Sequence, residues 1–244
     1  MPLQALIFDV DGTLAETEEL HREAFNASFA AAGLPWHWDH ALYAELLAVT
    51  GGKERIAHFI ARERLPPLGA EAVARLHADK TARYTGRVAE GGVPLRPGIA
   101  RLLTEARSAG LRLAIATTTS PPNVEALLRA TLGEDAPGWF AAIAAGDCVA
   151  AKKPAPDVYR VALERLGLPP GACIAFEDTV NGLLAARGAG IPTVVTLSAY
   201  GGTAGFDGAA AVVDHLGEPG LPCRALVGPP GEIVDVAWLR ALTA

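Results

Sequence analysis

Two aspartates separated by one residue, Asp9 and Asp11, come directly after an apolar run and just before Gly12. In this spacing, one carboxylate can attack phosphorus while the other first protonates the leaving oxygen and then activates water. The same residues also suit an Asx turn after a strand, which carries no chemistry. The pair alone therefore indicates either a phosphoryl-transfer site or an ordinary turn, and the rest of the chain decides between them.

A run of hydroxyl-bearing residues follows a second apolar segment. It consists of Thr117, Thr118, Thr119 and Ser120. We expect this run at the end of a strand and the start of a helix, where hydroxyls and free backbone amides suit a phosphoryl oxygen. Taken by itself, the run is equally compatible with a plain helix cap.

A lysine and an acidic pair complete this set of polar residues. Lys153 precedes prolines that would fix the backbone and direct its cation, although a lysine without such a context is more often a solvated surface residue. Glu177 and Asp178 follow another apolar run, and hard oxygen ligands there suit Mg²⁺. Because a lysine and Mg²⁺ would neutralise carboxylates and a phosphate that otherwise repel one another, all four elements are compatible with one site.

These residues need an α/β scaffold to bring them together. Short apolar runs alternate with longer helical patterns, which is typical of parallel βαβ units in a doubly wound, Rossmann-like sheet. The predicted strands are residues 5–10, 111–116, 173–176, 193–197 and, more weakly, 211–213, and predicted helices begin at Pro97, Pro121 and Asp157. Ligands of such sheets bind beyond the carboxyl ends of the strands, where the polar elements fall.

Residues 16–90 interrupt this alternation. They have helical periodicity and no convincing strand, so we expect an inserted α-helical cap domain, with residues 1–15 and 91–244 forming the catalytic core. The expected inner face of its first helix consists of Leu20, Ala24, Ala27 and Ala31. Residues 217–231 are rich in Gly and Pro, and we expect them to be irregular.

The four polar elements, in this order on successive strand ends, resemble the haloacid dehalogenase superfamily of phosphohydrolases over nearly the whole chain. The resemblance implies that Asp9 is the nucleophile and Asp11 the general acid/base. It also implies that Thr117 and Lys153 bind the phosphoryl group that is transferred. It also implies a Mg²⁺ site, whose expected ligands are Asp9, the Asp11 backbone carbonyl and Asp178, with Glu177 as an indirect ligand.

A more specific resemblance lies in the cap and after Thr117. The stretches 50–56 (TGGKERI), 21–26, 117–120 and 123–127 are similar to the CbbY family. This similarity implies a phosphatase that removes the 1-phosphate of xylulose-1,5-bisphosphate, a by-product that inhibits Rubisco. The expected substrate-binding residues are Glu16, His21, Gly51, Gly52, Lys53, Arg55, Lys80, Thr118, Thr119 and Ser120.

Cations in the cap offer a place for a second phosphate. Lys53 and Arg55 are expected in a glycine-led loop and Lys80 on a later helix, so that two or three charges could converge on one anion. Each of them, taken alone, is equally well a solvated helix charge. His21 and Glu16 could contact sugar hydroxyls, although His21 suits a packing position equally well.

Composition and charge exclude other classes of partner. With a net charge of −6 over 244 residues, the chain has no basic field for nucleic acid or an anionic membrane, so we expect a small-molecule sugar phosphate as its partner. Three widely separated cysteines indicate reduced thiols, and the N-terminus has no leader pattern, so we expect a cytoplasmic protein. We expect a monomer.

Alternative functions remain open at this level. A β-phosphoglucomutase-like mutase shares the fold, cap and motifs but returns the phosphoryl group to a sugar, and a phosphatase for another sugar phosphate differs only in its substrate. Dehalogenation and phosphonate cleavage are disfavoured, because Asp11 would have no ester oxygen to protonate. A non-catalytic binding module is also disfavoured, because Asp9, Lys153 and Asp178 are present as well.

Overall fold

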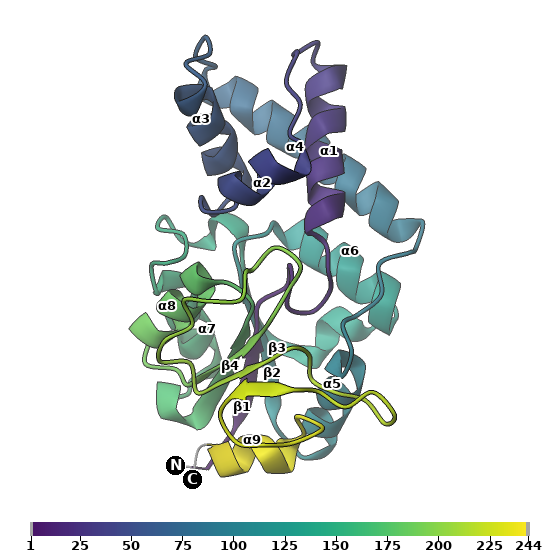
Figure 1. The fold of residues 1–244 in the computed structure, drawn as a ribbon. Coiled ribbons are helices and arrows are strands. Elements are labelled where there is room, and N and C mark those ends of the chain that lie inside the picture. The colour runs from purple at the N-terminus through teal and green to yellow at the C-terminus, as the bar shows by residue number, and fades with distance from the viewer. Residues whose placement is uncertain (1, 243–244) are drawn as a thin grey trace.

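A seven-stranded sheet forms the centre of the larger unit of the computed structural model, which describes residues 2–242 (Figure 1). Its strands are β1 (Ala5–Phe8), β2 (Arg112–Thr117), β3 (Phe140–Ala145), β4 (Cys173–Glu177), β5 (Thr193–Thr196), β6 (Ala211–Val213) and β7 (Ala225–Val227). Their order across the sheet is β3-β2-β1-β4-β5-β6-β7, and all neighbouring pairs are parallel except β6 and β7. The predicted doubly wound α/β fold is confirmed.

The side chains of β1 alternate between two cores, one on each face of the sheet. Leu6 and Phe8 belong to the core that also contains residues of α5 (Ile99–Ser108), α6 (Pro121–Leu132) and α9 (Val236–Leu242). Ala5 and Ile7 belong to the core formed with α7 (Asp157–Leu166) and α8 (Val180–Gly188). A strand that is buried on both faces has a continuous apolar run, which makes β1 visible in the sequence.

Four helices form the second unit and stand above the sheet in Figure 1. They are α1 (Glu18–Ala31), α2 (His40–Leu46), α3 (Gly52–Arg62) and α4 (Ala70–Ala89). Their shared core is largely aromatic and includes Phe25, Phe29, Trp38, Tyr43 and Phe59. All four helices lie within the predicted insert, whose boundaries at residues 16 and 90 stay a prediction.

Two connecting segments join these cap helices to the sheet and lie side by side. Ala15 pairs with Leu95 in an antiparallel bridge, and the Arg96 N–H donates to the Leu14 carbonyl at 2.8 Å. The buried Arg96 guanidinium also forms an ion pair with Glu16 at 3.2 Å. These contacts fix the start of the cap relative to the residues that follow β1.

The structure corrects the predicted elements in the second half of the chain. Strand β7 lies inside residues 217–231, which the sequence predicted to be irregular, and β3, α8 and α9 were absent from the predicted elements. Strand β3 reads FAAIAA, and its alanines have little strand propensity. Strand β7 is a three-residue edge strand, so it has too few residues for a recognisable period.

The buried face of α1 also differs from the predicted one. The buried residues of this helix are His21, Ala24, Phe25, Ser28 and Phe29. Of the predicted face, only Ala24 is among them. Polar residues point inward here because they have partners, as when the Ser28 hydroxyl donates to the Leu76 carbonyl at 2.9 Å. A search for apolar periodicity does not detect a face of this kind.

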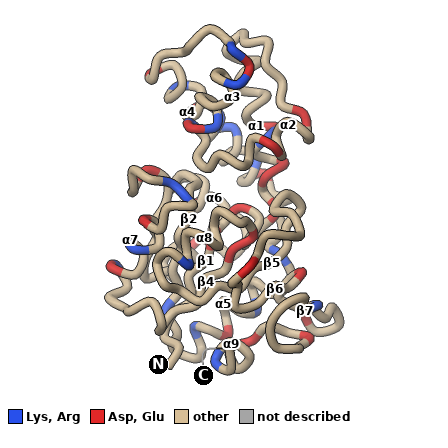
Figure 2. The backbone as a smooth tube through the Cα atoms, turned by 60° about the vertical axis from the view of Figure 1, so that its left-hand side comes forward, with Lys and Arg blue, Asp and Glu red and all other residues tan. Residues whose placement is uncertain are grey.

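Figure 2 shows that basic and acidic residues are interspersed along both units of the described chain. None of the described helices is both long and apolar enough to cross a membrane.

Candidate active site

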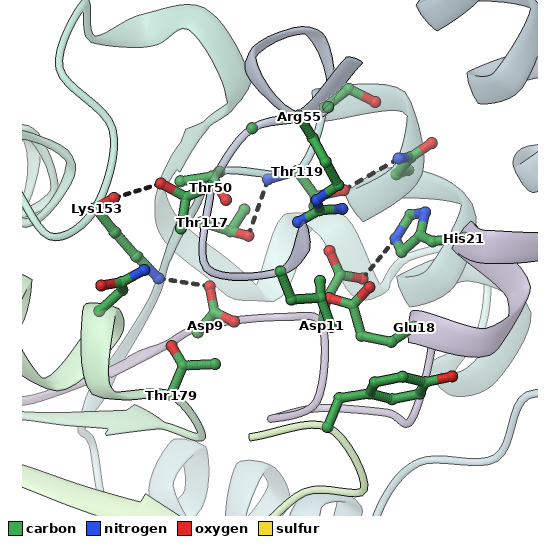
Figure 3. A pocket seen from close by; sticks show the side chains of 18 of the residues that line it. Asp9, Asp11, Glu18, His21, Thr50, Arg55, Thr117, Thr119, Lys153 and Thr179 are labelled. Atoms are coloured by element: carbon green, nitrogen blue, oxygen red, sulfur yellow. Dashed lines mark hydrogen bonds and ion pairs between the residues drawn. The ribbon is translucent and has the colours of Figure 1, made fainter. Parts of the chain in front are cut away.

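A pocket of about 100 Å³ lies between the carboxyl ends of β1, β2 and β4 and the cap helices (Figure 3). From the core, its lining includes Asp9, Asp11, Thr117, Thr118, Thr119, Ser120, Lys153, Glu177 and Asp178, and from the cap it includes His21, Gly51, Gly52, Arg55 and Lys80. The structure therefore brings together all four polar elements of the sequence and most of the predicted cap residues.

Lys153 pairs with two carboxylates at the bottom of the pocket. Its Nζ lies 2.6 Å from Asp9 Oδ1 and 2.6 Å from Glu177 Oε1, and the Tyr159 hydroxyl also donates to Glu177. Although burial opposes the charged lysine, the two carboxylates raise the pKa of Lys153 further above its usual value. Burial raises the pKa of Asp9 to about 7, even though Lys153 acts in the opposite direction. Lys153 is thus a fixed cation beside the predicted nucleophile.

Three buried carboxylates form a cluster that one lysine does not neutralise. Ligand atoms of Asp9, Glu177 and Asp178 lie within 4.8 Å of one another. Burial, together with the charges of Asp9 and Glu177, raises the pKa of Asp178 well above its usual value. Glu177 Oε2 is buried and has no hydrogen-bond partner among the described residues. A divalent metal fits this cluster, because it would supply the missing positive charge and accept hard oxygen ligands.

Asp11 points away from this cluster towards the first residues of the cap. It accepts a hydrogen bond from the Thr17 hydroxyl at 2.5 Å, and its Oδ1 lies 2.9 Å from His21 Nε2. Burial alone would raise the pKa of Asp11, but the neighbouring His21 and Thr17 hold it well below its usual value. In this arrangement Asp11 is an ionised carboxylate that can act as a base.

A buried lysine determines which nitrogen of His21 carries a proton. Lys80 Nζ lies 2.5 Å from His21 Nδ1, and the imidazole stacks on the Tyr84 ring at 4.0 Å. When Lys80 is protonated it can only donate, so Nδ1 then accepts and Nε2–H donates to Asp11. His21 was predicted to contact sugar hydroxyls, whereas here it connects Asp11 to Lys80. The contact gives His21 a place in proton transfer to or from Asp11.

The hydroxyl run forms a polar wall at the N-terminus of α6. The Thr119 N–H donates to the Thr117 hydroxyl at 3.2 Å, and the Asn123 amide donates to the Thr119 hydroxyl at 3.0 Å. Ser120 Oγ and Asn123 Oδ1 are buried without a hydrogen-bond partner among the described residues. Free hydroxyl, amide and helix N-terminal groups suit an oxygen-rich ligand.

Arg55 reaches the pocket from α3 through a buried network inside the cap. Its guanidinium donates to the Leu46 carbonyl at 3.3 Å and to the Tyr43 hydroxyl at 3.1 Å. The Tyr43 hydroxyl donates in turn to Glu18 Oε2 at 2.7 Å, and Glu18 also lines the pocket. This network holds the Arg55 cation in a defined orientation.

Lys53 and Glu16 are the two predicted substrate residues that the structure does not place in this pocket. Lys53 lies in the first turn of α3 instead of the expected loop, and its Nζ pairs with Asp147 at 2.6 Å. Residues two positions apart on a helix point in nearly opposite directions, so Lys53 faces away when Arg55 faces the pocket. Glu16 is exposed and pairs with Arg96 in the linker.

Several residues of the pocket carried no signal in the sequence. Glu18, Thr179 and Tyr200 line it without belonging to a recognisable spacing, and Asn123 lies in the stretch 123–127 noted for its family resemblance but was given no role. His77, one helical turn before Lys80, also lines it, and burial lowers its pKa to about 4, so the imidazole is neutral. Glu18 and His77 reach the site because the cap folds over the sheet, whereas Thr179 and Tyr200 belong to core segments that follow β4 and β5.

Comparison with known proteins agrees with this geometry. The model of the haloacid dehalogenase-like hydrolase family matches residues 3–190, a range that contains all four polar elements of the core. The fold and the site thus define a haloacid dehalogenase-like hydrolase.

Individual relatives narrow the class. The plasmid-encoded protein CbbY of Cupriavidus necator is 55% identical over an alignment of 246 residues that covers 98% of this chain and 96% of that protein. The crystal structure of CbbY from Rhodobacter sphaeroides in complex with phosphate is 53% identical with a TM-score of 0.82, covering 87% of this chain and 94% of that one. A mutant of the same protein, solved in complex with xylulose-1,5-bisphosphate, gives the same values. This chain belongs to the CbbY family of haloacid dehalogenase-like hydrolases.

Family and site together make the chain a phosphoric monoester hydrolase. Its buried carboxylate cluster fits the divalent metal that such a hydrolase requires.

Proposed function

We propose that the chain is a Mg²⁺-dependent phosphatase that removes the 1-phosphate of xylulose-1,5-bisphosphate through an aspartyl-phosphate on Asp9. The observation that carries the proposal is the buried pair of Asp9 and Lys153, 2.6 Å apart, at the base of a pocket lined by cap cations. The choice of substrate is supported by the relative that is 53% identical and was solved with xylulose-1,5-bisphosphate.

The two carboxylates divide the chemistry. In the first half-reaction, an Asp9 oxygen attacks phosphorus, the bond from phosphorus to the sugar oxygen breaks, and Asp11 gives that oxygen a proton. His21 is the group in contact with Asp11 that can deliver this proton to it. In the second half-reaction, Asp11 takes a proton from water, the water oxygen attacks phosphorus, and Asp9 is released as a carboxylate.

Mg²⁺ is the proposed metal because the available ligands are all hard oxygens. Asp9, Asp178 and the Asp11 backbone carbonyl would hold it, with Glu177 as an indirect ligand. When bound, the ion would neutralise charge on the phosphoryl oxygens. Lys153 contributes a fixed cation, and the hydroxyl of Thr117 donates to the same oxygens.

The second phosphate of the substrate is proposed to bind Arg55 and Lys80 in the cap, with the hydroxyl run of the core as its neighbour. Both cations are buried and line the pocket, so they carry little bound water. A phosphate that reaches them therefore displaces little water when it forms charge-assisted hydrogen bonds. Lys53 is not included, since it faces Asp147 outside this pocket.

Covalent catalysis on Asp9 is tested by two substitutions. Asp9→Asn should abolish turnover because an amide is a poor nucleophile, while Asp11→Asn should leave a slow enzyme that accumulates phosphorylated Asp9. Turnover is measured as phosphate release, and the adduct by intact mass after acid quenching. Asp9→Asn activity within about tenfold of wild type, roughly 1.4 kcal/mol, would exclude this mechanism.

The cap assignment is tested by substrate selectivity. Wild type should hydrolyse xylulose-1,5-bisphosphate far more efficiently than glucose 6-phosphate. Arg55→Ala should lower kcat/KM for the bisphosphate by about 10- to 150-fold, since a charge-assisted contact contributes roughly 1.5–3 kcal/mol. Hydrolysis of p-nitrophenyl phosphate, which cannot reach the cap, should barely change.

Lys53→Ala is the matched control, because it removes the same charge two residues away on the same helix. It should change kcat/KM for the bisphosphate by less than about threefold, as expected for loss of an exposed ion pair. Equal losses in Arg55→Ala on both substrates would assign Arg55 to folding of the cap. Product analysis separates the mutase alternative, which would return phosphate to the sugar instead of releasing it.

We also propose that the enzyme works as a cytoplasmic monomer without nucleic-acid or membrane partners. The interspersed charges and the net charge of −6 support the absence of nucleic-acid and membrane partners. Light scattering of the purified protein tests the oligomeric state.

A further inference from the structure

The loop after β5, residues 197–201, contacts the carboxylate cluster on one side and the cap on the other. It lies at the strand end next to β4, which carries the cluster. The chemistry proposed above uses none of its residues, although Tyr200 lines the pocket.

On the side of the cluster, the loop holds Asp178. The Ser198 hydroxyl donates to Asp178 Oδ2 at 2.6 Å and accepts from the Gly201 N–H at 2.9 Å. Gly201 lies so close that a Cβ atom there would come within 2.2 Å of the Asp178 carbonyl oxygen. A Cβ on Gly12 would come within 2.1 Å of Asp178 Oδ2. Asp178 is therefore packed between two glycines, and the Ser198 hydrogen bond ties its carboxylate to the loop.

On the side of the cap, the loop is held by Tyr200. Its hydroxyl donates to Glu19 Oε2 at 2.9 Å and lies 2.6 Å from His40 Nδ1. Its ring stacks on His40 at 5.8 Å and meets the edge of Tyr43 at 5.8 Å. One core side chain thus contacts both α1 and α2.

The beginning of the loop is fixed to the linkers between cap and core. The Ala199 N–H donates to Glu16 Oε2 at 3.3 Å, and Arg96 donates to the Leu197 carbonyl while it pairs with Glu16. Because Ser198, Tyr200 and the linker contacts all lie within five residues, a displacement at one of them is transmitted to the others over a very short segment.

We propose that Tyr200 is a positioning residue that couples the cap to the metal site. Its contacts with Glu19 and His40 hold the loop against Asp178, and Ser198 then orients the Asp178 carboxylate towards Asp9. The inference rests on the proposed Mg²⁺ site and adds that cap position and Mg²⁺ affinity are linked. Linkage of binding equilibria is reciprocal, so Mg²⁺ binding also favours the cap position seen here.

The test is calorimetric titration of full-length protein with Mg²⁺, without substrate, so that affinity is measured independently of turnover. Tyr200→Phe keeps the ring and removes the hydroxyl, and it should weaken Mg²⁺ binding by about 3- to 10-fold. Saturating Mg²⁺ should restore kcat for the sugar phosphate, because the catalytic groups themselves are unchanged. Glu19→Gln should weaken binding in the same direction, and the double variant should lose no more than the larger single loss.

Lys53→Ala is the control, because it breaks the Asp147 contact between cap and core at a place that does not involve the loop, and it leaves the Lys152 pair of Asp147 intact. Its Mg²⁺ affinity should equal that of wild type. If Asp178→Asn abolishes Mg²⁺ binding while Tyr200→Phe and Glu19→Gln bind as tightly as wild type, the coupling is wrong and the proposed metal site stands. An equal loss in Lys53→Ala would also overturn the coupling. Undiminished binding in Asp178→Asn would refute the metal site itself.

Discussion

Lys80 is a cation held in an apolar part of the cap. Its side chain is 4% exposed, contacts His21 Nδ1 at 2.5 Å, and lies over the rings of Phe25 and Tyr84 at 4.7 and 5.4 Å. Burial lowers the pKa of Lys80 to about 7, while the charge of Asp11 acts in the opposite direction. The unfolded chain therefore binds more protons than the folded protein between about pH 7 and 10.5, and over this window Lys80 makes stability rise with pH.

Replacement of Lys80 with methionine should therefore stabilise the fold and impair the enzyme. Methionine removes the buried charge at similar volume, so the free energy of unfolding at pH 7 should increase by a few kcal/mol, at about 1.4 kcal/mol per unit of pKa depression. The gain should shrink towards zero as the pH approaches 10.5. Urea unfolding of both proteins from pH 7 to 10 measures it, and a gap that does not vary with pH would contradict the assigned pKa.

The same variant should lose activity, because His21 loses the donor that fixes its tautomer. Its kcat should fall more than its KM rises if the relay to Asp11 is the main role of Lys80. An activity equal to that of wild type would mean that Lys80 only fills space in the cap.

The predicted chemical residues of the core lie together because each follows a parallel strand. Asp9 and Asp178 come directly after β1 and β4, and Thr117 is the last residue of β2. The carboxyl ends of these neighbouring strands meet at one edge of the sheet. Residue type and spacing were therefore sufficient to predict that these three residues lie close together. The cap residues follow no such rule, since the position of Arg55 depends on how α3 turns over the pocket, and Lys53 on the same helix faces elsewhere.

At the scale of elements, the sheet was predictable where its strands are buried on both faces and rich in branched residues, as in β1 and β5. It was not predictable in β3, where four of six residues are alanine, or in β7, which is supported by pairing with β6 alone. Helix α1 could be located, but its inner face could not, because His21 and Ser28 are inward-pointing polar residues. Their hydrogen-bond partners, the Asp11 carboxylate and the Leu76 carbonyl, lie outside the helix, so helical periodicity does not reveal them.

The element that connects these features is the pair of linkers between cap and core. Arg96 holds them together through its ion pair with Glu16 and its hydrogen bond to the Gly12 carbonyl. Gly12 has a positive φ of 77° and faces Asp178, so the turn after Asp11 accepts no larger side chain there. The start of the cap and the carboxylate cluster are thus built on one short turn.

At the scale of the whole molecule, the site lies where the two units meet. The Thr50 hydroxyl donates to the Lys153 carbonyl, Asn181 donates to the Ala48 carbonyl at 3.1 Å, and Tyr200 reaches Glu19. A ligand in the pocket touches both units, so its binding energy contributes to their docking. The cluster of Asp9, Glu177 and Asp178 lies beneath this contact between cap and core. Its negative charge, where no cation compensates it, opposes folding.

Metal removal should therefore change the stability of the whole protein, and Asp178 should determine the size of the change. With Mg²⁺ at about 100 times its Kd, binding stabilises the folded state by roughly 2.7 kcal/mol, which corresponds to a rise in Tm of roughly 5–10 °C for a chain of this length. In Asp178→Asn, Mg²⁺ should raise Tm by less than about 2 °C, because one of the two side-chain ligands is lost.

In excess chelator the order of the two proteins should reverse. Burial near Asp9 and Glu177 raises the pKa of Asp178, which means that its ionised form opposes folding, and asparagine removes this charge while it still accepts from Ser198. Metal-free Asp178→Asn should consequently melt at a higher temperature than metal-free wild type, and below wild type when Mg²⁺ is present. Calorimetric scans at pH 7.5 with and without Mg²⁺ give all four values. A variant that melts below wild type under both conditions would show that Asp178 stabilises the fold without the metal, contrary to the charge balance of the cluster.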